Sequence, residues 1–186
     1  MDIAAIGSHL QLSRSTLTSY INALEALFII ERVPAWTKTD YERVGKQDKL
    51  FMTDTGLMAA LLEWNFEKIQ FDGERHGKFI ETLVFTQLAA LIDAQTERYT
   101  LYHYKDRDRR EIDFIIENSE NNILGIEVKS GSHVSKDSFK HLKWFKEHMD
   151  KGKNFVGIVF YSGAHSIPFG DKLWAVPLST LWQKPS

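Results

Sequence analysis

Apolar residues recur every three or four positions through the first 30 residues of the chain. This spacing places apolar side chains on one face of a helix and predicts two amphipathic helices. Ile3, Ile6 and Leu10 share a face in the first, and Ser13 stands where the N-cap of the second is expected. Because only residues 11–12 link the two helices, the segment predicts a helix-turn-helix.

Two runs with strand character follow, at residues 29–33 and 49–53, and polar or charged residues separate them. This layout is typical of a β-hairpin wing, so the start of the chain is expected to form a winged helix. A short helix, capped by residues 54–56, comes next. We therefore expect a winged helix-turn-helix domain over residues 1–66 and a second domain over residues 67–186.

Longer helices alternate with strands beyond residue 73. A helix is predicted from about Arg75 to Asp93, with Phe79, Leu83, Val84, Leu88 and Leu91 on its inward face. Strands are predicted at 99–104, 111–117 and 123–129, a helix at 135–149, and strands at 154–161 and 173–178. This order indicates an α/β domain built around a mixed sheet.

Composition limits the classes of function. The 186 residues include 23 basic and 25 acidic side chains, and this balance is not that of a dedicated nucleic-acid binder, so DNA contacts would come from local patches. The absence of cysteine excludes disulfides and thiolate metal sites. Neither a membrane span of ~20 apolar residues nor a signal-peptide layout is present, so we expect a cytoplasmic protein without a membrane partner.

Charged residues inside two apolar strands are the main candidates for chemistry. Strand alternation divides residues 111–117 into one face with Ile112, Phe114 and Ile116 and another with Glu111, Asp113 and Ile115. Glu127 and Lys129 share a face of the next strand, ~6.6 Å apart by strand geometry. Buried charges are costly unless they are paired or bind a metal. Asp113, Glu127 and the Val128 carbonyl would suit a hard cation such as Mg²⁺, with Lys129 beside it to orient or deprotonate water.

The order of these residues resembles a known signature. Asp113, followed fourteen residues later by the tripeptide EVK at 127–129, is similar to the PD-(D/E)XK nuclease superfamily, and Glu81 matches its upstream acidic residue. The resemblance covers roughly residues 75–186, although Glu-Ile-Asp replaces Pro-Asp. It implies a restriction-endonuclease-like fold that binds Mg²⁺ or Mn²⁺. The implied catalytic residues are Glu81, Asp113, Glu127 and Lys129, and the first three are the implied metal ligands.

A wider resemblance covers the whole chain. The winged-helix start and the segments KLFMTDTGL, GKFIETLV, EIDFII, EVKSG and LWAVPLSTLW resemble a domain of unknown function at the C-terminal end of many bacterial and archaeal AAA-type ATPases. No G-x-x-x-x-G-K-[ST] motif occurs, so ATP binding is not expected. We therefore expect that the chain is a piece of a longer protein and that the AAA-type ATPase region is missing from it.

Three groups of residues are candidates for contact with nucleic acid. They are Arg14, Thr16, Thr18 and Asn22 on the second helix, Arg107, Arg109 and Arg110 at a hairpin tip, and Lys136 and Lys140 on the helix after the EVK strand. Each group has an alternative explanation. The first two helices could pack against a protein partner, the hairpin tip could be a solvated turn, and the lysines could form a charged outer helix face.

Two hypotheses about function follow from these patterns. The first is a metal-dependent DNA phosphodiesterase. The alternative is a non-catalytic DNA- or protein-binding regulatory module of an ATPase, in which Lys129 simply neutralises Glu127. Nothing in the sequence indicates an oligomeric state.

Overall fold

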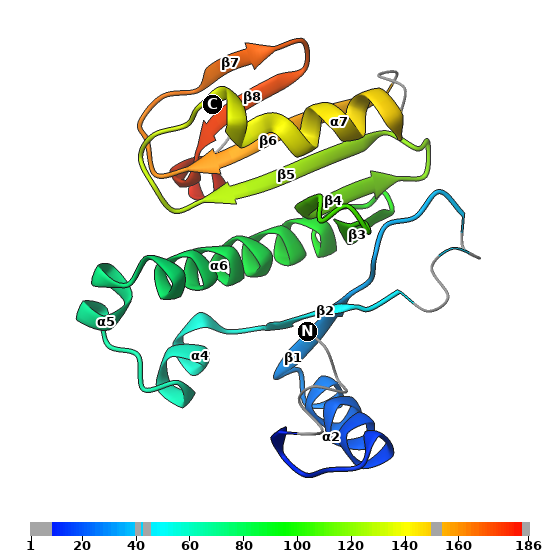
Figure 1. The fold of residues 1–186 in the computed structure, drawn as a ribbon, viewed down its shortest axis with the longest axis vertical. Coiled ribbons are helices and arrows are strands. Elements are labelled where there is room, and N and C mark those ends of the chain that lie inside the picture. Colours follow the sequence, from blue (N-terminus) through cyan, green and yellow to red (C-terminus); the bar gives the residue numbers. More distant parts are fainter. Residues whose placement is uncertain (1–8, 40–41, 43–45, 150–153, 184–186) are drawn as a thin grey trace.

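The computed structural model describes residues 9–39, 42, 46–149 and 154–183. Helices and a hairpin precede a six-stranded mixed sheet (Figure 1). The elements follow one another as α2 (Arg14–Ala26), β1 (Ile30–Val33), β2 (Lys49–Met52), α4 (Thr55–Leu61), α5 (Phe66–Phe71), α6 (Gly73–Asp93), β3 (Tyr99–Lys105), β4 (Glu111–Asn118), β5 (Ile123–Lys129), the 3₁₀ helix η1 (Lys136–Phe139), α7 (Lys140–His148), β6 (Phe155–Tyr161), β7 (Ile167–Gly170), β8 (Leu173–Pro177) and the 3₁₀ helix η2 (Leu178–Trp182). Of the described helices, none combines the length and apolar composition needed to cross a bilayer.

Helix α2 and the β1–β2 hairpin are the described part of the expected winged helix. Ser13 caps α2 as predicted, because its hydroxyl oxygen accepts the N–H of Thr16 at 3.1 Å. Leu17 and Ile21 are buried, and β1 pairs antiparallel with β2. The first predicted helix, with Ile3 and Ile6, lies outside the described residues.

The hairpin packs into the core of the larger sheet. The ring of Phe51 in β2 stacks on Phe85 of α6 at 4.6 Å and lies 5.4 Å from Phe114 of β4. Beyond β1, the chain continues to the edge of β3, where the N–H of Trp36 donates to the carbonyl of His103 at 2.7 Å. The hairpin and the sheet therefore share buried side chains on both sides of the predicted domain boundary.

The six strands lie in the order β3-β4-β5-β6-β8-β7. Pairing is antiparallel from β3 to β5, parallel from β5 through β6 to β8, and antiparallel between β8 and β7. The parallel step from β5 to β6 requires a crossover, which contains η1 and α7. The mixed α/β sheet predicted from the sequence is therefore confirmed.

Helices α6 and α7 cover opposite faces of the sheet. Ile123 of β5 packs in a buried cluster with Phe145 of α7, whereas Ile126 packs in a second cluster with Phe85 of α6. Side chains three positions apart on a strand face opposite sides, which explains the two clusters. In Figure 1, α7 crosses β5 and β6, and α6 runs on the side of the hairpin.

Helix α6 begins two residues earlier than predicted, because the Asp72 carboxylate caps it by accepting N–H groups of the first turn at 3.0 and 3.1 Å. Val84 and Leu88 are buried, as predicted. The prediction that Leu91 faces inward is wrong, since its side chain is 47% exposed where the last turn extends past the core. Phe85 is buried and was not among the predicted inward residues.

Gly125 in β5 lies where two buried side chains from α7 and β6 meet the strand. A Cβ at this position would lie 2.7 Å from Phe155 Cζ and 2.9 Å from Leu142 Cδ2. We expect Gly125→Ala to lower the free energy of unfolding by roughly 1 to 3 kcal/mol through overpacking. Urea denaturation measures this, with Gly131→Ala as the control because no atom lies within 4 Å of that added Cβ. Equal stability of the two variants would contradict the close packing of Phe155 and Leu142 against Gly125.

Candidate functional site

A bulge in β4 lies next to Asp113. Tyr102 and Tyr104 of β3 pair with Ile115 and Ile112 of β4, so three steps on β4 match two on β3. The extra residue brings Ile112 and Ile115 into the same cluster on the α7 side. The predicted alternation, which placed Ile112 with Phe114, is therefore wrong at this point, because a bulge disrupts strict alternation and redirects a side chain.

Asp113 and Glu127 lie where β4 and β5 separate. The described pairing ends at Phe114 and Ile126, and continuing that register would place Asp113 opposite Glu127. The carboxylate of Asp113 accepts the N–H of Val128 at 2.8 Å, which fixes it against the end of β5. Asp113 and Glu127 both line one pocket of about 290 Å³. The other residues around the pocket are Glu111, Lys129, Asp137, Ser138, Lys140 and His141.

Glu127 is a buried carboxylate with only one of its oxygens paired. The residue is 6% exposed, and its Oε2 accepts from Lys129 Nζ at 3.1 Å. Among the described residues, its Oε1 has no hydrogen-bond partner, and His141 Nδ1 lies 3.8 Å away. Burial, and then the charge of Asp113, raises the pKa of Glu127 to about 7, although Lys129 opposes the shift. Glu127 therefore lines the pocket and has one buried oxygen without a partner among the described residues.

Glu81 of α6 is held by a residue that the sequence did not single out. Lys49 of β2 donates a hydrogen bond to Glu81 and lies 3.4 Å from Glu111 Oε1 and 3.6 Å from Asp113 Oδ1. Burial opposes the charge of Lys49, but the attraction of the three carboxylates raises its pKa, so it is an ammonium at neutral pH. The hairpin thus supplies a cation to the acidic residues of the sheet.

Sequence reasoning also did not select Glu111 and His141. By alternation, Glu111 shares a face with Asp113, which is a signal that could have identified it. His141 occupies α7, and its Nδ1 lies 2.8 Å from the Glu111 carbonyl oxygen. No sequence spacing connects His141 with Glu127, because the two residues meet only when α7 packs on the sheet.

The donor set suits a hard divalent cation. Among the described residues, no three His, Cys, Asp or Glu side chains converge as a preformed metal shell. Asp113 and Glu127 nevertheless offer carboxylate oxygens to one pocket, and Glu127 Oε1 is buried without a partner. Oxygen ligands of this kind bind Mg²⁺ or Mn²⁺, so the residues present fit such an ion.

The polar residues of α2 are largely engaged within the protein. The Thr18 hydroxyl donates to the Arg14 carbonyl at 2.8 Å, and the Asn22 side-chain oxygen accepts from Arg32 at 2.6 Å. The Thr16 hydroxyl lies 2.8 Å from that of the cap residue Ser13. Arg14 is exposed. Of the four predicted contact residues on this helix, Arg14 therefore offers the side chain most accessible to a phosphate.

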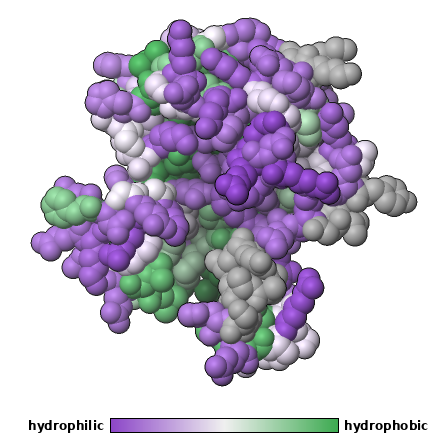
Figure 2. Space-filling model, in the orientation of Figure 1, coloured by the Kyte–Doolittle hydropathy of each residue, from purple (hydrophilic) through white to green (hydrophobic). Residues whose placement is uncertain are grey.

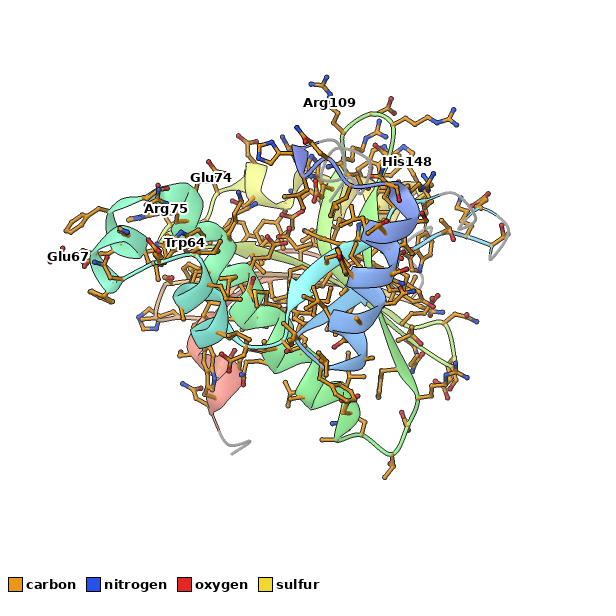
Figure 3. All side chains as sticks on the ribbon, turned by 90° about the horizontal axis from the view of Figure 1, so that it is seen from below. Trp64, Glu67, Glu74, Arg75, Arg109 and His148 are labelled. Atoms are coloured by element: carbon orange, nitrogen blue, oxygen red, sulfur yellow. The ribbon has the colours of Figure 1, made fainter. Side chains whose placement is uncertain are left out.

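The three arginines of the β3–β4 turn differ in environment. Arg110 pairs with Asp106 at 2.7 Å and with Asp108 at 2.9 Å, and its guanidinium lies 4.0 Å from the centre of the Trp144 ring. Arg107 and Arg109 are exposed, and Figure 3 shows Arg109 projecting away from the rest of the protein. Arg110 is therefore a structural residue of the turn, whereas Arg107 and Arg109 face solvent.

The two predicted lysines lie at the start of the helical crossover. Lys140 is exposed and lines the pocket of Asp113 and Glu127, while Lys136 is exposed one turn earlier in η1. The structure thus brings together Asp113, Glu127, Lys129 and Lys140 at one pocket. Glu81 reaches this group through Lys49.

A second pocket, of about 490 Å³, lies on the other side of Lys49. Lys49, Glu81 and Lys78 line it together with apolar residues of β2 and α4. Leu61 of α4 and the following C-cap residue Leu62, which both line the pocket, are 65% and 49% exposed. Figure 2 shows hydrophobic surface over α4, bordered by hydrophilic surface. The groove is therefore largely apolar, with Lys49, Lys78 and Glu81 as the charged residues of its lining.

Comparison with known proteins gives relatives without an assigned activity. Two uncharacterized proteins, from Mycobacterium bovis and Mycobacterium tuberculosis, are each 26% identical over 176 residues. The match covers 94% of this chain, which spans 37% of the length of each relative. A solved assembly of Thermococcus gammatolerans McrB AAA+ hexamers with bound McrC is similar to 54% of this chain and 27% of its own matched chain, at 12% identity and a TM-score of 0.40.

Two family profiles match successive parts of the chain. Residues 1–68 are similar to the domain of unknown function DUF8612. The profile of a second domain of unknown function matches residues 76–181, which contain all of the sheet and four of the acidic and basic residues described above, Glu81, Asp113, Glu127 and Lys129. Since this profile matches more than half of the 186 residues, the chain belongs to the DUF4143 family.

Proposed function

We propose that the chain carries a metal-dependent phosphodiesterase site that acts on DNA. The proposal includes a restriction-endonuclease-like PD-(D/E)XK core behind a winged helix. One observation carries it: Glu127 is buried with its Oε1 unpaired among the described residues, and the residue lines a pocket shared with Asp113 and Lys129. A buried carboxylate oxygen that lacks a hydrogen-bond partner destabilises a fold. Such a group is therefore typical of a site that binds a cation.

The proposal gives roles to residues in and beside the pocket. Asp113 and Glu127 would hold Mg²⁺ or Mn²⁺ together with the Val128 carbonyl, and Glu81 adds acidic charge from α6 through its contact with Lys49. When bound, the ion would lower the pKa of its water and offset charge on the phosphate. Lys129 lies 3.1 Å from Glu127 Oε2. Burial opposes its charge, but Glu127 and then Asp113 raise its pKa, so Lys129 acts as a hydrogen-bond donor that orients water and phosphate.

Phosphate contacts would come from exposed cations near the pocket. Lys140 lines it, and Lys136 is exposed in the preceding turn. Arg107 and Arg109 are exposed at the turn before β4 and could extend the contact along the DNA backbone. Arg14 of α2 would provide a further, separate contact. A few local cations of this kind suit phosphate binding without sequence readout.

A second function is a non-catalytic regulatory module of an AAA-type ATPase. The ion pairs of Lys49 with Glu81 and of Lys129 with Glu127 favour it, because they offset part of the acidic charge without a metal. The chain spans 37% of the length of its curated relatives, which leaves room for an ATPase region in a longer protein. In this proposal DNA or protein binding persists without cleavage.

A cleavage assay tests the proposed activity. We expect purified protein to cut plasmid or single-stranded DNA with Mg²⁺ or Mn²⁺ but not with EDTA. Lys129→Ala should lower the rate by about 100-fold or more, because the loss of one preorganised donor to charge in the transition state costs roughly 10² to 10³. Lys78→Ala is the matched control, since Lys78 is an exposed lysine that pairs with Glu74 on α6. Absence of cutting with either metal, or equal rates for wild type and Lys129→Ala, would overturn the proposal.

A further inference from the structure

The ammonium of Lys49 lies among three carboxylates that belong to two different elements. It donates a hydrogen bond to Glu81 of α6, and it lies 3.4 Å from Glu111 Oε1 and 3.6 Å from Asp113 Oδ1 of β4. The side chains of Lys49, Glu81 and Asp113 are largely buried, at 21%, 21% and 18% exposed, whereas that of Glu111 is 37% exposed. One ammonium group therefore interacts with three carboxylates at the same time.

The position of Lys49 is fixed by the hydrophobic core. Phe51, two residues further along β2, is 5% exposed and stacks on Phe85 at 4.6 Å. Strand alternation directs Lys49 and Phe51 to the same side, and the Lys49 ammonium lies 5.5 Å from the centre of the Phe51 ring. The cation is therefore held in place by packing, unlike a surface lysine that moves freely.

Asp113 connects this arrangement with the pocket of Glu127. Its Oδ1 faces Lys49, its Oδ2 accepts from Val128, and the residue lines the 290 Å³ pocket. The four carboxylates Glu81, Glu111, Asp113 and Glu127 carry four negative charges when ionised, and Lys49 and Lys129 offset two. Asp137 and Lys140 also line the pocket and add one charge of each sign. Lys105 forms an ion pair with Glu111 at 3.0 Å, but its side chain is 60% exposed, so it offsets only part of a charge. The remaining charge, at most two, balances one divalent cation and not two.

We infer that Lys49 occupies the place of a second metal ion, so that the site binds one divalent cation, between Asp113 and Glu127. This inference rests on the proposed function. It assigns Glu81 and Glu111 to Lys49, and it makes the β1–β2 hairpin a contributor to the electrostatics of the site. Lys49 is a positioning residue in this arrangement, because its ammonium holds carboxylates of the site.

The number of bound Mn²⁺ ions distinguishes the possibilities. Titration calorimetry and electron paramagnetic resonance on the full chain should give one Mn²⁺ per wild-type protein. Lys49→Met removes the charge with little change in length, and we expect it to bind two ions. Lys49→Arg keeps the charge and should bind one. Lys105→Met is the matched control and should also bind one, because Lys105 contacts Glu111 from the exposed side. Two ions in wild type, or one ion in Lys49→Met, would overturn the inference.

Thermal unfolding provides a readout that does not depend on cleavage. Without metal, Lys49→Met leaves three carboxylates close together, so its unfolding temperature should be lower than that of wild type. Excess Mn²⁺ should raise this temperature more in Lys49→Met than in Lys105→Met, because an ion that binds only the native state stabilises it. An equal increase in both variants would contradict the inference.

Glu81→Gln gives an independent test in a variant that keeps Lys49. Because Glu81 is assigned to Lys49, this variant should still bind one Mn²⁺. Loss of the ion would show that Glu81 is a ligand and would overturn the inference. Failure of wild type to bind any Mn²⁺ overturns the proposed function itself. One ion in both wild type and Lys49→Met overturns the assignment of Lys49 alone.

Discussion

Glu127→Gln should lower metal-dependent cleavage by about 10³-fold or more and, at the same time, stabilise the folded protein above pH 7. The loss of activity is expected because the neutral amide removes a charged ligand of the ion that would generate the nucleophile. The gain in stability is expected because the carboxylate is 6% exposed and one of its oxygens has no partner among the described residues. Opposite effects on activity and stability are typical of residues that function requires and folding does not.

The pH dependence of this effect has a definite sign. Folding raises the pKa of Glu127 from 4.5 to about 7, so the folded protein holds this proton more tightly than the unfolded chain does. Between these two pH values the wild type loses stability as the pH rises, since the unfolded state releases its proton first. The glutamine variant lacks this loss. We expect it to be more stable by about 2 kcal/mol at pH 8 and nearly equal to wild type at pH 4.

Denaturation with urea at pH 4 and pH 8 measures the difference. Glu120→Gln is the matched control, because Glu120 is exposed and should show little change at either pH. Added Mg²⁺ should stabilise wild type but not Glu127→Gln. If Glu127→Gln is less stable than wild type at pH 8, interactions in the folded protein offset the cost of burying the carboxylate, and this prediction is wrong.

Phe51→Ala should lower the free energy of unfolding by about 3 to 5 kcal/mol, the usual cost of removing a buried phenylalanine ring. Phe51 is 5% exposed and contacts the rings of Phe85 and Phe114, each 0 to 1% exposed. A cavity there would separate the hairpin from α6 and β4. Because Lys49 belongs to the same short strand, its contact with Glu81 should weaken as well.

Phe71→Ala is the control for this substitution. It makes the same chemical change at a position that is 83% exposed, where a cost within about 0.5 kcal/mol is expected. Urea denaturation of both variants gives the comparison, and hydrogen exchange of β1 and β2 reports on the hairpin itself. A cost below about 1 kcal/mol for Phe51→Ala would mean that the hairpin does not depend on this contact.

Much of the fold could be predicted because its elements have strong periodic signals. The strand at Ile123–Lys129 and the caps at Ser13 and Asp54 occur where the sequence predicts them. The short elements that were missed include a helix and an edge strand. Phe66–Phe71 forms a helix with no buried residue, and Ile167–Gly170 is a strand at the edge of the sheet with a largely exposed pattern. Neither has the alternation between buried and exposed positions that sequence analysis detects.

The candidate site could be predicted only in part. Asp113, Glu127 and Lys129 stand out because charge inside an apolar strand is unusual, and the structure places all three at one pocket. The bulge that places Ile112 on the opposite face from Phe114 has no signal in the sequence. Lys49 could not be selected either, because it follows a charged stretch that resembles a solvent-exposed loop and lies 32 residues before Glu81. Its role depends on packing between distant segments.

The contact between residues 34–36 and β3 has a consequence for solubility. β3 is an edge strand of the sheet, and such an edge can pair with an edge of another molecule. Here Pro34 accepts the N–H of His103 at 3.0 Å, and Trp36 donates to the His103 carbonyl at 2.7 Å. A chain that began at residue 67 would leave this edge open and would lose the apolar cover of Trp36. The N-terminal segment therefore also protects the sheet from edge-to-edge self-association.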